Sequence, residues 1–218
     1  MAQEFDIELM NNQEQRLPCI LILDTSASMS GEPIKELQSG LEYFAKDVQS
    51  DDDAKQKVQI MVIKCGGSAE VISDWTDAEN FEAPDLYADG MTPMGAALDL
   101  AAEEIENQKQ IYRNNGISYL KPWIFIISDG APNDNNWERS ASNFKQLEKD
   151  GKFTVFTIAV EDADQHILSK FSIREPQKLQ GIEFNKLFEW ISASVRIGSQ
   201  KVSDSDKTKL PPIDWATV

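Results

Sequence analysis

The sequence is poor in the residues that common hydrolytic and zinc sites use, with 2 cysteines and 1 histidine among 218 residues. A structural zinc site takes several Cys or His ligands, which this set does not supply. A Ser-His-Asp or Cys-His mechanism would depend on His166, which lies near Asp164 and far along the chain from any exposed nucleophile turn. We therefore interpret His166 as a surface or helix-start residue.

The two cysteines, Cys19 and Cys65, lie in apolar, strand-like segments. Because no export signal is recognisable in the sequence, we expect buried free thiols rather than a disulfide, although the segments leave a pair open.

Positive charge and long apolar runs are also scarce. The chain has 21 Lys and Arg against 37 Asp and Glu, a formal charge of −16, and no basic cluster. This balance disfavours nucleic acid or an anionic membrane as the main partner. The longest strongly apolar run, Trp123 to Ile127, is far shorter than the roughly 20 residues that span a bilayer. The first fifteen residues are acidic and lack the basic start and apolar stretch of a secretory signal, so we expect a cytoplasmic protein.

What the chain does contain is an alternation of strand-like runs and helical periodicity. Apolar runs predict strands, and apolar residues spaced by three and four predict helices. The expected strands are Leu17–Leu23, Val58–Ile63, Ala69–Trp75 (as a hairpin partner), Pro122–Ser128, Phe153–Val160 and Gln177–Leu179. The expected helices begin at Glu32-Pro33, at Thr92-Pro93 with Thr92 as the cap, and near Asn136, followed by Ile167–Phe171 and Phe184–Val195.

This order predicts one α/β domain over residues 16–198, with a mostly parallel sheet between two helical layers. Residues 1–15 form an N-terminal extension, to which Phe5, Ile7 and Leu9 add at most a short strand. Residues 199–218 are polar, contain Pro211-Pro212, and predict a flexible tail in which only Trp215 has reason to dock.

Three segments with small oxygen-bearing side chains lie where a ligand site forms in such sheets, beyond the carboxyl ends of the strands. They supply two carboxylates and three hydroxyls: Asp24, Ser26, Ser28, Thr92 and Asp129. These are hard oxygen donors, which suit Mg²⁺ or Mn²⁺ better than a soft metal. With only two negative charges in the set, the cation keeps an open position that an Asp or Glu of a partner protein can fill.

The pattern Asp-x-Ser-x-Ser, a distant Thr and an Asp-Gly after an apolar strand resembles the metal-ion-dependent adhesion site (MIDAS) of von Willebrand factor A (vWA) domains. The resemblance covers Leu17 to Val195 and departs mildly from the family at Ala27, where many relatives have Gly. It implies a three-layer, Rossmann-like vWA fold with a six-stranded sheet in the order 3-2-1-4-5-6 and one antiparallel edge strand. It also implies that Ser26, Ser28 and Thr92 are hydroxyl ligands, and that Asp24 and Asp129 bind the ion directly or through water.

Finer features resemble the bacterial TerY-like branch, which is associated with tellurium resistance and related stress clusters. These features are the opening RLPCILILDTSASMSGEPI, the turn SDGAPND and the closing FNKLFEWISASV. The resemblance implies a cytoplasmic scaffold whose partners include a protein phosphatase and a kinase-like protein.

Two alternatives to a metal-dependent interaction module remain open. In the first, the chain is a metal-assisted phosphatase or hydrolase with Asp24 as the nucleophile, but position 26 is Ser and no Lys sits at a matching strand end to hold a phosphate. In the second, the metal site is vestigial and contacts run through the tail or the acidic loop Asp77–Asp89. We expect a binding domain and not an enzyme.

Overall fold

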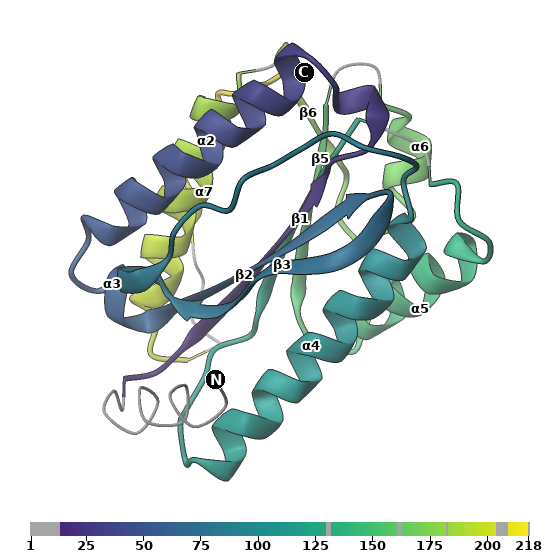
Figure 1. Cartoon of the computed structure of the whole chain (residues 1–218). Helices are drawn as coiled ribbons and strands as arrows, with labels where there is room; N and C mark the ends of the chain where they lie inside the picture. Colours follow the sequence, from purple (N-terminus) through teal and green to yellow (C-terminus); the bar gives the residue numbers. More distant parts are fainter. Residues whose placement is uncertain (1–13, 130–131, 161–162, 182, 204–208, 218) are drawn as a thin grey trace.

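The computed structural model describes residues 14–129, 132–160, 163–181, 183–203 and 209–217 (Figure 1). Its strands are β1 (Leu17–Asp24), β2 (Val58–Gly66), β3 (Ser68–Asp77), β4 (Trp123–Ser128), β5 (Thr154–Ala159), β6 (Gln177–Leu179) and β7 (Ala216–Thr217). Its α-helices are α2 (Glu32–Gln49), α3 (Ala54–Lys57), α4 (Met94–Asn114), α5 (Trp137–Lys149), α6 (Gln165–Leu168) and α7 (Phe184–Ser199), and two 3₁₀ turns are η1 (Ala27–Met29) and η2 (Ala78–Asn80).

All seven strands form one sheet in the order β3-β2-β1-β4-β5-β6-β7. The pairs β2–β1, β1–β4, β4–β5 and β5–β6 are parallel, and the edge strand β3 runs antiparallel to β2. The predicted order 3-2-1-4-5-6, with one antiparallel strand beside the hairpin, is confirmed. The sheet adds β7, which pairs antiparallel with β6 at the other edge.

Helices cover both faces of this sheet. Figure 1 shows α2 and α7 side by side on one face and α4 with α5 on the other. Strand β1 is buried along its whole length because alternate residues enter different cores. Leu21 and Leu23 join the cluster with α2 and α7, whereas Ile20 and Ile22 join the cluster with α4 and α5.

The described part of the C-terminal segment docks against the domain, which differs from the expected flexible tail. Trp215 is fully buried, and its ring lies 5.5 Å from that of Trp190. The indole nitrogen of Trp190 donates to the carbonyl of Pro211 at 3.0 Å. The aromatic packing and the β7 pairing hold residues 209–217 against the domain.

The two cysteines and the histidine lie as their sequence segments predict. Cys19 and Cys65 are buried free thiols, and burial raises the pKa of both well above the ordinary thiol value. His166 lies exposed in the first turn of α6, where the Asp164 carboxylate accepts its backbone N–H at 2.8 Å. Among the helices that the structure describes, none combines the length and apolar composition needed to cross a membrane. The weak strand expected at Phe5, Ile7 and Leu9 lies outside the described residues.

Candidate metal site at the carboxyl ends of β1 and β4

The strand order brings two segments that are far apart in sequence to one edge of the sheet. β1 and β4 are parallel neighbours, with Leu23 opposite Ile127. The two strands therefore end side by side, with Asp24 closing β1 and Asp129 following β4. β1 lies between β2 and β4, where the strand order reverses, which is the usual place for a ligand site in such sheets.

The Asp24 carboxylate organises the loop that follows β1. Its Oδ1 accepts the backbone N–H of Ser26 at 2.9 Å, and its Oδ2 accepts the Ser128 hydroxyl at 2.5 Å. The loop then enters η1, a tight turn. The turn still brings the hydroxyls of Ser26 and Ser28 to 2.9 Å from each other.

The Ser28 hydroxyl closes the connection between the two strand ends. It donates to Oδ1 of Asp129 at 3.0 Å. Four of the five residues predicted as ligands are thus linked by hydrogen bonds, in the order Asp24, Ser26, Ser28 and Asp129. Asp24 and Ser26 are buried, Asp129 is half-buried and Ser28 is exposed, so the chain of oxygens runs from the interior to the surface.

Thr92, the fifth predicted residue, reaches this region through its backbone. Its carbonyl accepts the N–H of Asn133 at 3.2 Å, and the carbonyl of Gly90 accepts the N–H of Ala27 at 3.0 Å. These bonds hold the segment that carries Thr92 between the loops after β1 and β4. The expectation that Thr92 caps the following helix is wrong, because α4 begins at Met94 with Pro93 as its N-cap and no capping side chain at that position.

Two further side chains, which were not predicted as ligands, form hydrogen bonds that organise the site and its surroundings. Ser128 holds Asp24, as described above. Asp134 caps α4 from a distant loop: its carboxylate accepts the N–H groups of Gly95 at 3.2 Å and Ala96 at 3.0 Å. No local spacing in the sequence connects Asp134 with α4. Ser128 was accessible to prediction, because it is the strand residue next to Asp129.

Glycines permit the close approach of the loops around the site. A Cβ atom on Gly66 would lie 2.2 Å from the carbonyl oxygen of Thr25. Gly90 has φ +63°, and a Cβ atom there would lie 2.6 Å from Cα of Gly67. A side chain at Gly66 would push the loop after β1 away from the end of β2, and one at Gly90 would push the loop before α4 away from the turn between β2 and β3.

The electrostatics of the site are those of an unbalanced acidic pair. Burial raises the pKa of Asp24, and the hydrogen bonds from Ser128 and Ser26 lower it by less. Burial, followed by the charge of Asp24, raises the pKa of Asp129. No Lys, Arg or His in the described part of the chain forms an ion pair with either carboxylate.

These donors fit a hard cation that is completed by water or by a partner. A divalent ion would supply the positive charge that the two carboxylates lack, and the hydroxyls would add neutral oxygen ligands. Within the residues described, no three His, Cys, Asp or Glu side chains group to hold a metal. An ion at this place therefore has few charged protein ligands.

The same geometry disfavours Asp24 as a nucleophile. Its side chain is fully buried, and each carboxylate oxygen accepts a hydrogen bond. A nucleophilic carboxylate needs one oxygen free to approach the reacting atom.

Comparison with known proteins agrees with the fold. The family model described as the von Willebrand factor type A domain matches residues 19–181. No curated protein matches the sequence.

Several solved structures share the architecture at low sequence identity. The pilus adhesin SpaC of Lactobacillus rhamnosus GG, in its open conformation, superposes with a TM-score of 0.68 at 11% identity, over 86% of this chain and 31% of SpaC. A von Willebrand factor type A protein of Catenulispora acidiphila superposes with a TM-score of 0.62 at 16% identity, over 84% of this chain and 43% of that one. The vWF domain of the type V pili tip protein Mfa5 of Porphyromonas gingivalis superposes with a TM-score of 0.62 at 13% identity, over 86% of this chain and 97% of the Mfa5 domain. The chain thus spans less than half of SpaC and of the Catenulispora protein.

Proposed function

Because this chain belongs to the von Willebrand factor type A domain family, we propose that it is a protein-interaction domain with a metal-ion-dependent adhesion site. Domains of this family commonly mediate contacts between proteins. Asp24, Ser26, Ser28, Thr92 and Asp129 would hold Mg²⁺ or Mn²⁺, and the ion would offer an open coordination position to an Asp or Glu of a partner protein. The domain itself has no catalytic role in this proposal.

One observation carries the proposal: the hydrogen-bonded connection from Asp24 through both serines to Asp129, with no cation of the described residues paired to either acid. In this arrangement, Ser128 and the Ser26 N–H orient Asp24. Ser28 and Asp129 lie toward the surface, where a partner has access. The low net ligand charge favours capture of a further carboxylate.

The cellular setting that we propose rests on the likeness of three sequence segments to the TerY-like branch. In this setting the domain is a cytoplasmic scaffold of a bacterial tellurium-resistance or stress system, and a protein phosphatase and a kinase-like protein are partners. Proteins with a similar fold include a pilus adhesin and a type V pili tip protein. Recovery of the native partners from lysate with Mg²⁺, and their release by EDTA, would support the scaffold role. Recovery unchanged by EDTA would contradict metal-dependent capture.

The metal site is tested by titrating Mn²⁺ into the full chain, with free Mn²⁺ followed by electron paramagnetic resonance. We expect saturable binding of one ion by the wild type, loss of binding in Asp24→Ala, and at least tenfold weaker binding in Ser28→Ala. Ser30→Ala is the matched control, because Ser30 is also exposed on this loop but lies beyond the predicted ligands. Equal affinity in the wild type and in Asp24→Ala would favour a vestigial site.

A further inference from the structure

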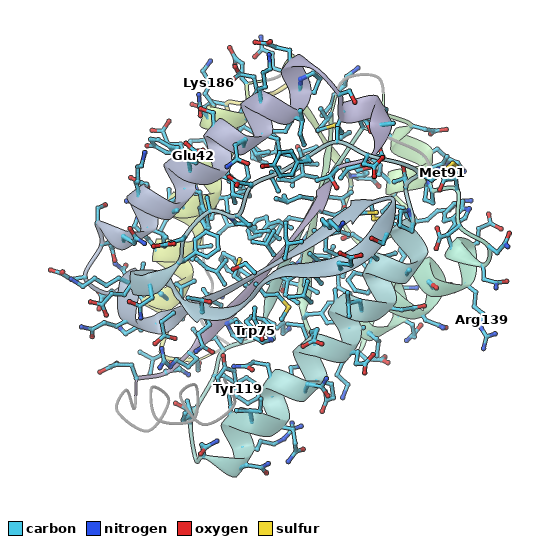
Figure 2. The ribbon with its side chains drawn as sticks, viewed as in Figure 1. Glu42, Trp75, Met91, Tyr119, Arg139 and Lys186 are labelled. Atoms are coloured by element: carbon cyan, nitrogen blue, oxygen red, sulfur yellow. The ribbon has the colours of Figure 1, made fainter. Side chains whose placement is uncertain are left out.

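Two large apolar side chains are exposed on the loop that leads into α4. Tyr87 is 75% exposed and Met91 is 61% exposed. Figure 2 labels Met91 at the edge of the molecule, near the start of α4. Among the described residues, the other exposed large apolar side chains belong to different segments: Tyr43, Ile173, Ile197, Val202 and Ile213.

Backbone hydrogen bonds fix this loop against the candidate metal site. The N–H of Asp89 donates to the carbonyl of Thr25 at 2.8 Å, and the carbonyl of Met91 accepts the N–H of Gly67 at 2.8 Å. Met91 directly precedes Thr92. Tyr87 borders a cavity of about 250 Å³ that Thr25 also lines, and Met91 directly follows Gly90, whose carbonyl accepts the N–H of Ala27 in the loop after β1 at 3.0 Å.

The three loop segments around these two residues carry only negative charge. The segments 24–32, 85–93 and 132–136 contain Asp24, Glu32, Asp85, Asp89 and Asp134, and no Lys or Arg. The nearest lysine on the same cavity, Lys64, is paired with Glu70 at 3.2 Å. A cluster of acidic residues on a partner would be repelled by this rim, whereas one carboxylate aimed at a cation would not.

We infer that the partner segment carries a single Asp or Glu with a large apolar residue beside it and with basic residues in place of further acids. The carboxylate completes the metal site, while Tyr87 and Met91 cover the adjacent apolar side chain. Exposed aromatic and methionine side chains are enriched where proteins meet, and they bury apolar area on contact. This inference rests on the proposed metal-dependent function.

The test measures binding of fluorescein-labelled nine-residue peptides to the full chain in Mg²⁺ by fluorescence anisotropy. The first peptide has a central aspartate between two leucines, with lysines outside them. Three others replace the leucines by serines, the lysines by glutamates, or the aspartate by asparagine. We expect the first peptide to bind about tenfold more tightly than the serine and glutamate peptides, and the asparagine peptide to show no Mg²⁺-dependent binding.

The double variant Tyr87→Ser, Met91→Ser should reduce the affinity of the first peptide to that of the serine peptide. Its matched control, Tyr43→Ser with Ile173→Ser, changes two exposed apolar residues in other segments and should keep the preference. Equal affinities for all acidic peptides, no peptide binding, or the same loss in both double variants would overturn the inference.

Mn²⁺ binding separates failure of this inference about the partner segment from failure of the proposed metal-dependent function. If the wild type binds Mn²⁺ but has no preference among the peptides, only the partner chemistry is wrong. If the wild type binds no Mn²⁺, the proposed site is wrong and the inference falls with it. Mn²⁺ affinity should be the same in the Tyr87 and Met91 double variant as in the wild type, since neither residue is a predicted ligand.

Discussion

Two polar clusters lie at opposite ends of the same parallel strands, and they differ in how their charge is balanced. At the amino ends, fully buried Arg16 pairs with Asp77 at 3.1 Å, and Gln59 donates to the same carboxylate at 2.6 Å. At the carboxyl ends, Asp24 and Asp129 are connected through serine hydroxyls and have no cationic partner among the described residues.

The amino-end cluster is a structural network. Gln108 and Tyr112 of α4 donate to the side-chain oxygen of Gln59 on β2, and Arg16 also donates to the carbonyl of Gln56 at 2.6 Å. These bonds join the start of β1 to the start of β2, to the end of β3 and to the second half of α4. The comparison teaches that buried polarity alone does not indicate a binding site: the amino-end cluster contains its own counter-charge, whereas the carboxyl-end cluster has none among the described residues.

Removing the cation of the balanced cluster should have the largest effect. Arg16→Met leaves Asp77 next to the core without its counter-charge, which costs about 3 kcal/mol when a pair of this kind loses one member. We expect this loss in the free energy of unfolding measured with urea. Arg16→Lys, which keeps the charge, should lose less.

The matched control is Arg113→Met, because Arg113 also pairs with a carboxylate, Glu106 at 2.7 Å, but both side chains are exposed. Water can replace this pair, so we expect little change in stability. A similar loss in Arg16→Met and Arg113→Met would show that the buried position of the first pair has no special energetic weight.

An intermediate effect is expected at Asp134, a carboxylate of the carboxyl end that is balanced by a helix terminus. Asp134→Ala removes the acceptor for the first N–H groups of α4, and loss of a capping side chain costs about 0.5–2 kcal/mol. Asp134→Asn keeps a capping oxygen and should stay close to the wild type. Thermal unfolding of the three proteins in EDTA checks this order; equal melting temperatures for the alanine variant and the wild type would contradict it.

The fold was predictable to the extent that local patterns determine it. The continuous apolar run at Leu17–Leu23 predicts a strand buried on both faces, and Glu32-Pro33 predicts the start of α2; both predictions are confirmed. The short strand β7 was not predictable, because two residues carry no period and their strand state depends on pairing with β6. The start of α4 was placed too early because its cap comes from Asp134, which is remote in sequence.

The candidate site was predictable where strand ends position the residues. Parallel neighbours must end at one edge, so Asp24 and Asp129 could be brought together from the strand order alone. The serines followed from their position after β1. The hydrogen bond from Ser128 to Asp24 could not be derived, since it depends on the side-chain direction at the last residue of β4. Binding of a metal remains a prediction from the chemistry of the donors.

The smallest change in stability is expected where the proposed site itself is altered without metal. In EDTA, Asp24→Asn should leave the free energy of unfolding equal to or slightly above that of the wild type. The folded protein raises the pKa of Asp24, which means that it disfavours the charged carboxylate, and the amide removes that charge. The amide oxygen can still accept the Ser26 N–H, and the Ser128 hydroxyl can turn to accept from the amide nitrogen.

Addition of Mg²⁺ to the same two proteins should reverse their order. An ion that binds only the folded state at a concentration one hundred times its dissociation constant stabilises it by about 2.7 kcal/mol, and only the wild type should gain this. Since the substitution is nearly silent without metal, the difference that appears with metal reports the ion and not damage to the fold. A clear loss for Asp24→Asn in EDTA would mean that the carboxyl end already holds its counter-charge, as the amino end does, and the contrast between the two clusters would disappear.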